Sequence, residues 1–283
     1  MIVLVAGDPL RPRRPDEHFA AEADAARAAG LDVAVVDHDA LASPDGARRA
    51  VSRVPEGAGI AVYRGWMLRA GHYAAFAEAL AARGVTLRTG PEQYRQAHEL
   101  PGWYAALAAV TPATAWTTGD DRDGFDRAAA TLGPGPAVLR DYTKSMKHHW
   151  HEAAYIPDLA DTAAGWTVAS RFRELRDDEF TGGFVLRRFE SFGSAEVRTW
   201  WVAGACRLVG PHPDTPHDAP PATLDLSAVE PLVAALALPF VTVDLALRTD
   251  GEWRVIELGD GQVSDRPSTV DPGTFVTAMI PPD

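Results

Sequence analysis

Apolar residues in about the first ninety positions form short continuous runs that alternate with amphipathic stretches. The runs at 2–6, 31–36, 59–63 and 85–87 predict buried strands. Residues 16–30 and 70–83 predict helices that end at or next to a glycine. Continuous apolar strands that alternate with helices are typical of a parallel sheet covered by helices on both faces. We therefore predict a Rossmann-like αβα domain over residues 1–95.

The pattern changes in the second half, where short strands follow one another across brief turns. Residues 91–135 are predicted to be mostly helical. From residue 137 onward, the segments AVLRDY, GGFVLRRF, EVRTWWVAG, ACRLVG, FVTVDLAL and WRVIELG each have the composition of a strand. They predict antiparallel sheet with helices on one side. The predicted fold class is therefore α/β followed by α+β.

The segment FVTVDLALRTDGEWRVIELGDGQ carries the most informative pattern. Asp250-Gly251 is a strong signal for a two-residue hairpin turn, because both central positions of that turn need positive φ. With this turn, Arg248 faces Trp253 and Asp244 faces Glu257 on one face of the hairpin. The other face is apolar and is predicted to be core.

Two carboxylates at about 5 Å across a strand pair destabilise the sheet unless something compensates their charge. A divalent cation is one compensation, and Mg²⁺ usually takes one or two carboxylates together with substrate phosphates. The alternatives are a protonated carboxyl that shares its proton, or an arginine inserted between the two. A turn that is longer or shorter by one residue would remove the pairing.

Composition excludes several classes of protein. The formal net charge of −12 argues against a nucleic-acid backbone as the main partner. No apolar run approaches the roughly 18 residues of a membrane helix, so no membrane partner is expected. The single cysteine excludes an intramolecular disulfide and a cysteine-cluster metal site. The N-terminal segment is read as a strand and not as a signal peptide, so a cytoplasmic location is expected.

Basic residues are distributed unevenly. Of the 27 basic residues only two are lysines, Lys144 and Lys147, and they lie three positions apart in DYTKSMKHHW. A lysine retained in so arginine-rich a chain suggests a position that requires a compact ammonium, although a surface position is the alternative. Two arginines, Arg11 and Arg64, follow predicted parallel strands, where ligands of such sheets bind. They are candidates for binding substrate.

Taken in order, these motifs resemble the ATP-grasp superfamily. The pair Asp244 and Glu257 on VDLAL…VIELGDGQ looks like that superfamily's magnesium-binding carboxylates, and Glu196 looks like its ribose-binding acid. Arg140, Lys144 and Arg188 look like phosphate and adenine-side contacts, with Lys147 beside them. YRGWM, RDYTKSMKHHW and IELGDGQVSD resemble a smaller bacterial clade that has arginine at the position of Arg140 where the classical enzymes have lysine.

The sequence departs from the superfamily's pattern at two positions. The usual Glu-x-Asn metal motif reads Glu257-Leu258-Gly259, so either Asp260 or Gln262 is expected to replace the missing ligand. The usual acidic hinge residue is absent unless Glu190 substitutes for it. The resemblance places an ATP-grasp domain at residues 96–283, with nucleotide between subdomains at about 111–183 and 184–283.

The resemblance also implies an activity. ATP and Mg²⁺ would activate a substrate carboxylate as an acyl phosphate, and an amine would then attack it. Lys144 and Arg140 would neutralise the transferring phosphoryl group, and Arg198 would stabilise the acyl phosphate. The expected partners are a small carboxylate and an amine, and a homodimer is left open. The alternatives are a small-molecule kinase on the same fold and a non-catalytic nucleotide-binding protein.

Overall fold

The computed structural model describes residues 1–281, apart from the side chains of residues 194 and 195. Contacts divide the chain into two units. The first unit contains Met1–Ala97, Ala195–Leu245 and the chain from Glu257 onward, and the second contains His98–Ser194 and Ala246–Ile256. Strands of the late sheet contribute to both units, so neither is continuous in sequence. The division predicted at residues 95/96 stays a prediction.

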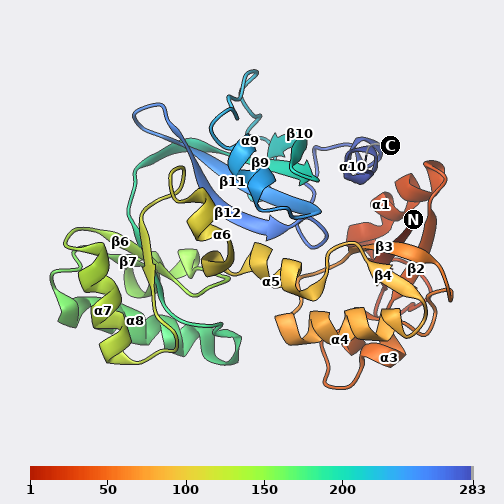
Figure 1. The fold of residues 1–283 in the computed structure, drawn as a ribbon, viewed down its shortest axis with the longest axis horizontal. Helices are drawn as coiled ribbons and strands as arrows, with labels where there is room; N and C mark the ends of the chain where they lie inside the picture. Colours follow the sequence, from red (N-terminus) through yellow and green to blue (C-terminus); the bar gives the residue numbers. More distant parts are fainter. Residues whose placement is uncertain (282–283) are drawn as a thin grey trace. The chain divides into compact units, whose positions relative to one another are not determined.

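The first unit begins with a parallel sheet of order β2-β1-β3-β4 (Figure 1). Its strands are β1 (Ile2–Ala6), β2 (Asp32–Val36), β3 (Gly59–Arg64) and β4 (Val85–Leu87). The helices between and after them are α1 (Glu17–Ala28), α2 (His38–Leu41), α3 (Ala47–Ala50), α4 (Ala70–Ala81) and α5 (Pro91–His98). The Asp16 carboxylate caps α1 by accepting the His18 N–H at 2.9 Å. The predicted parallel domain is confirmed.

Both faces of this sheet are buried, which explains why its strands are continuously apolar. Ile2 and Leu4 point to one face and pack with the aromatic side chains of α4. Val3 and Val5 point to the other face and join a core that contains α1 residues and Trp200 from the late sheet. The parallel sheet and the late sheet therefore share a core within the first unit.

The second unit contains an antiparallel sheet of order β5-β8-β6-β7. The strands are β5 (Thr114–Trp116), β6 (Ala137–Arg140), β7 (Tyr155–Ile156) and β8 (Val185–Arg188). The helices are α6 (Leu100–Leu107), α7 (Arg122–Leu132) and α8 (Thr162–Arg176), with the short helical segments η1 (Lys147–His149), η2 (Trp150–Ala154) and η3 (Asp177–Glu179). A core of phenylalanine and aliphatic side chains lies between this sheet and α7 and α8.

The late sheet has the order β10-β9-β11-β12. Its strands are β9 (Phe192–Val202), β10 (Ala205–Pro211), β11 (Phe240–Arg248) and β12 (Trp253–Asp260), accompanied by α9 (Glu230–Ala235) and α10 (Pro272–Met279). Strands β9 and β10 pair antiparallel. The fold class predicted from the sequence, a parallel αβα part followed by antiparallel sheets, is confirmed.

The turn between β11 and β12 differs from the prediction. The Gly251 N–H donates to the Arg248 carbonyl at 2.8 Å, and the Arg248 N–H donates to the Glu252 carbonyl at 2.8 Å. Three residues therefore form the loop, with Gly251 at φ +91°, as in a turn followed by a glycine bulge. The predicted pairing of Arg248 with Trp253 is wrong, but the Gly261 N–H still bonds the Phe240 carbonyl, in the predicted register. The register thus shifts by one residue along the hairpin.

No helix among residues 1–281 combines the length and the apolar character that crossing a bilayer requires.

Candidate functional site

Asp244 and Arg198 form the centre of the candidate site in the first unit. Asp244 lies on β11 and Arg198 on the neighbouring strand β9. The guanidinium donates from Nε to Oδ1 and from Nη2 to Oδ2 of Asp244, both at 2.8 Å. The Asp244 side chain is only 4 % exposed, so this bidentate pair is shielded from water. An arginine thus compensates the Asp244 charge, which is one of the alternatives that the sequence left open.

The charges around this pair reinforce one another. Burial opposes ionisation of Asp244, but Arg198 and then His212 outweigh it and hold the pKa of Asp244 at about 2. Burial also opposes the charge of Arg198, yet Asp244, Glu257 and Asp265 outweigh it and raise the pKa of Arg198 above its ordinary value. Both Asp244 and Glu257 therefore act on the same guanidinium. Their assignment as magnesium ligands stays a prediction.

His212 and Glu196 complete this cluster. One donor atom each from Glu196, His212 and Asp244 lies within 4.8 Å of the others. His212 directly follows β10, and its N–H donates to the Glu196 carbonyl at 3.2 Å. Its Nε2 lies 3.7 Å from Asp244 Oδ2. Burial lowers the pKa of His212, but the Asp244 carboxylate outweighs it and the pKa is raised above its usual value.

Asp260 and Gln262, the expected replacements for the missing metal ligand, belong to a buried network. The Gln262 amide accepts the Tyr63 N–H at 3.0 Å and donates to the Tyr73 hydroxyl at 2.7 Å. Asp260 Oδ1 accepts the Gln262 N–H at 2.9 Å. Burial raises the pKa of Asp260 to about 6. These bonds fix the segment after β12 against the parallel sheet.

Arg64 at the end of β3 is 1 % exposed and spends its donors inside the protein. Its Nε and Nη2 donate to the Glu22 carboxylate, with Nε to Oε2 at 2.7 Å. The other bonds reach main-chain carbonyls of Gly261, Gln262 and Ser264 at 2.7 to 3.0 Å. All five N–H groups of the guanidinium are used. This differs from the prediction that Arg64 clamps an anionic substrate, because the side chain joins β3 to the segment after β12.

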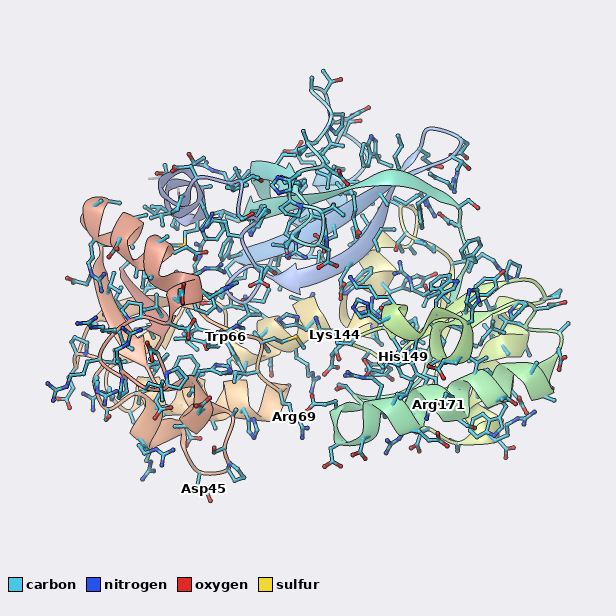
Figure 2. All side chains as sticks on the ribbon, turned by 180° about the vertical axis from the view of Figure 1, so that it is seen from behind. Asp45, Trp66, Arg69, Lys144, His149 and Arg171 are labelled. Atoms are coloured by element: carbon cyan, nitrogen blue, oxygen red, sulfur yellow. The ribbon has the colours of Figure 1, made fainter. Side chains whose placement is uncertain are left out.

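In the second unit, Arg140 and Lys144 flank a turn built on Asp141. The fully buried Asp141 carboxylate accepts the N–H groups of Thr143 and Lys144, each at 2.7 Å, and pairs with Arg176 at 3.0 Å. Arg140 donates from Nη2 to the Thr143 carbonyl at 2.7 Å. Lys144 is exposed, and its ammonium makes no ion pair with any residue in the described part of the chain (Figure 2). The turn therefore presents Lys144 outward on a rigid backbone.

The other predicted nucleotide contacts lie in the same unit. Lys147 begins η1 and is exposed. Arg188 donates to the main-chain carbonyls of Leu132, Gly133 and Pro134 at 2.6 to 3.1 Å, so it holds the segment after α7. Glu190 pairs with Arg254 through two bonds of 3.0 and 3.1 Å. The contacts of Arg188 and Glu190 are thus structural, and their nucleotide roles stay predictions.

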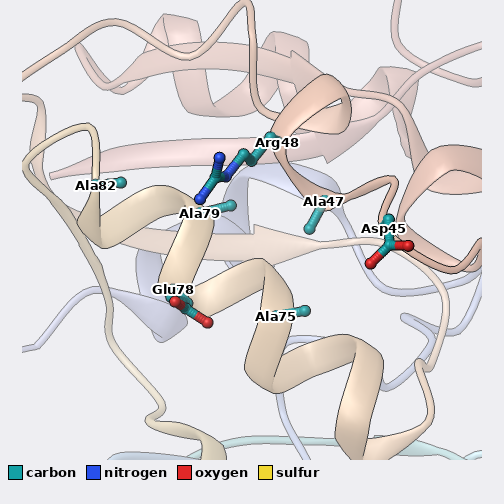
Figure 3. A pocket seen from close by; sticks show the side chains of 7 residues that line it. All are labelled: Asp45, Ala47, Arg48, Ala75, Glu78, Ala79 and Ala82. Carbon is teal, nitrogen blue, oxygen red and sulfur yellow. The ribbon is translucent and has the colours of Figure 1, made fainter.

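Two surface features of the first unit carry no part of this chemistry. Arg11 is exposed and pairs with Asp8 at 2.7 Å in the loop after β1, and its substrate role stays a prediction. A hollow of about 380 Å³ between α3 and α4 is lined by four alanines with Asp45, Arg48 and Glu78 (Figure 3). None of these lining residues was singled out in the sequence.

Sequence reasoning missed His212, Asp141 and Glu22. His212 lies in PHPDTPHDAPP, a proline-rich segment that predicts only a loop. Asp141 carries a local signal, because an aspartate two and three residues before main-chain N–H groups is typical of an Asx turn. Glu22 has no signal of its own, since its partner Arg64 lies far along the chain.

Comparison with known proteins identifies the family. Residues 131–279 match the sequence profile of an ATP-grasp domain, family 3 of its clade. This match covers more than half of the chain, and the protein belongs to that ATP-grasp family. No curated protein matches the chain in sequence.

Solved structures of low sequence identity share the fold. The D-cycloserine synthetase DcsG superposes with a TM-score of 0.65 at 19% identity, over 99% of this chain and 98% of the other. A RimK domain ATP-grasp protein from Sphaerobacter thermophilus gives 0.63 at 18% identity, over 99% and 97%. The ATP-grasp ligase PsnB, in complex with minimal precursor, Mg and ADP, gives 0.57 at 14% identity, over 98% and 96%. The chain therefore has the ATP-grasp fold along its whole length.

Proposed function

We propose that the protein is an ATP- and Mg²⁺-dependent ligase that joins a carboxylate to an amine through an acyl phosphate. The observation that carries this proposal is the Asp244–Arg198 centre, flanked by Glu196 and Glu257, inside the segment that matches the ATP-grasp family. The related fold of PsnB, a ligase whose structure contains Mg and ADP, supports the choice of nucleotide and ion.

The residues present fit a divalent cation. Asp244 is ionised at neutral pH because its pKa is held at about 2, and a metal ligand must be deprotonated. Glu196 and Glu257 supply further carboxylate oxygens, which hard cations prefer. Both Asp244 oxygens accept bonds from Arg198, so a cation bound there would take the place of one of these bonds. When bound, the ion would neutralise phosphate charge and orient the phosphoryl group.

The basic residues of the second unit suit a polyphosphate. Lys144 offers an exposed ammonium on a backbone fixed by Asp141, and Lys147 follows three residues later. Phosphoryl transfer needs mainly positioning and charge neutralisation, which such cations supply. In the proposed reaction a carboxylate oxygen attacks the γ-phosphorus and ADP leaves. The amine then attacks the acyl carbon, and phosphate leaves with the electron pair of the broken C–O bond.

Arg198 has a role of its own in this scheme. A guanidinium released from Asp244 could donate two parallel hydrogen bonds to an acyl phosphate or to its tetrahedral adduct. Its burial beside Asp244 keeps it oriented before substrate arrives, which lowers the cost of ordering it during the reaction.

A trapping assay tests the reaction class. The protein is incubated with ATP, Mg²⁺, pooled small carboxylates and hydroxylamine, an amine that converts acyl phosphates into hydroxamates. The ligase predicts hydroxamate and ADP that both require the acid. A stable phosphorylated product formed from one acceptor would instead identify a kinase. Nucleotide binding without turnover across the pools would identify a binding protein and contradict the proposal.

Lys144→Ala tests the phosphate role directly. We expect the affinity for a non-hydrolysable ATP analogue with Mg²⁺ to fall more than tenfold, because an unpaired ammonium is lost. Arg27→Ala is the matched control, since Arg27 is an exposed cation of α1 paired only locally with Asp24. Isothermal titration of both variants measures the effect. Unchanged affinity in Lys144→Ala would exclude the phosphate contact.

A further inference from the structure

The imidazole of His212 distinguishes the Glu196–His212–Asp244 cluster from a purely acidic one. Glu196 lies on β9 and Asp244 on the adjacent β11, while His212 follows β10 on the other side of β9. The main-chain bond from His212 to Glu196 extends the β9–β10 ladder and fixes His212 opposite Glu196. Three neighbouring strands thus bring one imidazole and two carboxylates within 4.8 Å.

Such a ligand set indicates the kind of ion. Mg²⁺ is held by oxygen ligands and waters, whereas imidazole suits first-row transition metals. We propose that Glu196, His212 and Asp244 form a site for a divalent transition metal of the Mn²⁺ type, with His212 as the ligand that favours it over Mg²⁺. The proposal rests on the proposed function for the ion's role in catalysis, but not for its binding.

The surroundings of His212 support coordination through Nε2. This atom faces Asp244 Oδ2 at 3.7 Å and Arg198 Nη2 at 3.4 Å. The other ring nitrogen, Nδ1, accepts the Asp214 N–H at 3.2 Å and lies 3.8 Å from the Asp214 carboxylate. Metal binding by Nε2 places the ring proton on Nδ1, where this carboxylate is the acceptor. A carboxylate behind a ligating histidine orients the ring and strengthens it as a ligand.

Arg198 has a second consequence in the metal-free protein. Its guanidinium already holds both oxygens of Asp244, so it competes with a metal for that carboxylate. Removing the guanidinium leaves the acidic ligands in place and takes away the competing charge. Metal affinity should therefore rise in Arg198→Gln and fall in His212→Gln.

Metal binding to the full chain, without nucleotide or substrate, tests the proposal. Mn²⁺ and Mg²⁺ are titrated separately by calorimetry, and bound Mn²⁺ is examined by electron spin echo envelope modulation, which detects a directly coordinated nitrogen. We expect Mn²⁺ to bind at least tenfold more tightly than Mg²⁺ and to show nitrogen modulation. In His212→Gln the Mn²⁺ affinity should fall at least tenfold, while the Mg²⁺ affinity changes less than threefold.

His217→Gln is the matched control, because His217 is exposed in the same proline-rich segment five residues further on. It should leave both affinities unchanged. Arg198→Gln should bind Mn²⁺ at least threefold more tightly than the wild type. If His212→Gln does not fold, the nitrogen modulation of the wild type decides the question.

Three results would overturn the proposal: no nitrogen modulation in the wild type, equal losses of Mn²⁺ and Mg²⁺ affinity in folded His212→Gln, or tighter binding of Mg²⁺ than of Mn²⁺. These outcomes are independent of the trapping assay. A protein that binds Mn²⁺ through His212 but forms no hydroxamate keeps the metal site and loses the ligase function. Hydroxamate formation without nitrogen modulation does the reverse.

Discussion

Asp260 at the end of β12 is a buried acid whose ionisation should lower the stability of the protein. Its side chain is fully buried, and burial raises its pKa from 3.8 to about 6. Oδ1 accepts bonds from Gln262, whereas neither Oδ2 nor the nearby Thr89 hydroxyl has a hydrogen-bond partner among the described residues. Asp260→Asn keeps the acceptor for Gln262 and replaces Oδ2 with an uncharged donor that can reach Thr89.

The sign of the pH effect follows from the raised pKa. The folded protein binds the Asp260 proton more tightly than the unfolded chain, so the free energy of unfolding decreases as pH rises from about 4 to about 6. A shift of about 2 units corresponds to about 3 kcal/mol of destabilisation once the group is ionised in both states. At pH 4.5 roughly 1 kcal/mol of this is already present, because the unfolded carboxyl is then largely ionised.

Urea unfolding at pH 4.5 and pH 8, followed by tryptophan fluorescence, measures the effect. The stability of Asp260→Asn relative to the wild type should increase by about 2 kcal/mol between the two pH values. Asp178→Asn, at an exposed aspartate in η3, is the control and should show no such change. A difference between Asp260→Asn and the wild type that is independent of pH would refute the reasoning. A large loss of metal affinity in Asp260→Asn would restore Asp260 as a metal ligand.

Two further predictions concern buried charges, one in each unit. Arg64→Lys should lower the free energy of unfolding by roughly 2–4 kcal/mol, because lysine replaces five fixed donors with three; unchanged urea stability would show that Arg64 is not a structural brace. Asp141→Asn should cost about 3–5 kcal/mol, since it leaves the largely buried Arg176 without its anion. It should also weaken binding of the ATP analogue through the turn that carries Lys144, and calorimetry at a temperature where the variant is folded would show normal affinity if the turn does not depend on Asp141.

The parallel part of the fold was predictable because its signals are local. Each strand is a continuous apolar run, and the helix that begins after Asp16 has its capping residue in the sequence. The hairpin turn was only partly predictable, since Asp250-Gly251 fits both a two-residue turn and a three-residue turn with a glycine bulge. Which of these forms depends on pairing further along β11 and β12, and that pairing has no signal near the turn.

Partners that lie far apart in sequence explain most of what the sequence analysis did not find. The acceptors of Arg64 are Glu22 and carbonyls about two hundred residues later, and a carbonyl has no side-chain signature. Arg198 and Asp244 meet because β9 lies beside β11, which only the strand order reveals. His212 reaches the same point because β10 lies on the other side of β9. The class of chemistry was predictable, but the ligands that assemble it were not.

The charge balance of the Asp244 centre unites the two readings of the carboxylate pair. Opposed carboxylates require a cation, and the structure provides Arg198 for that purpose. Glu196 and Glu257 add two more carboxylates to the same neighbourhood, so three carboxylates surround one guanidinium. With His212 neutral, two negative charges remain uncompensated. Arg198 therefore satisfies Asp244 without satisfying the site, and the remaining charge is the amount that one divalent ion neutralises.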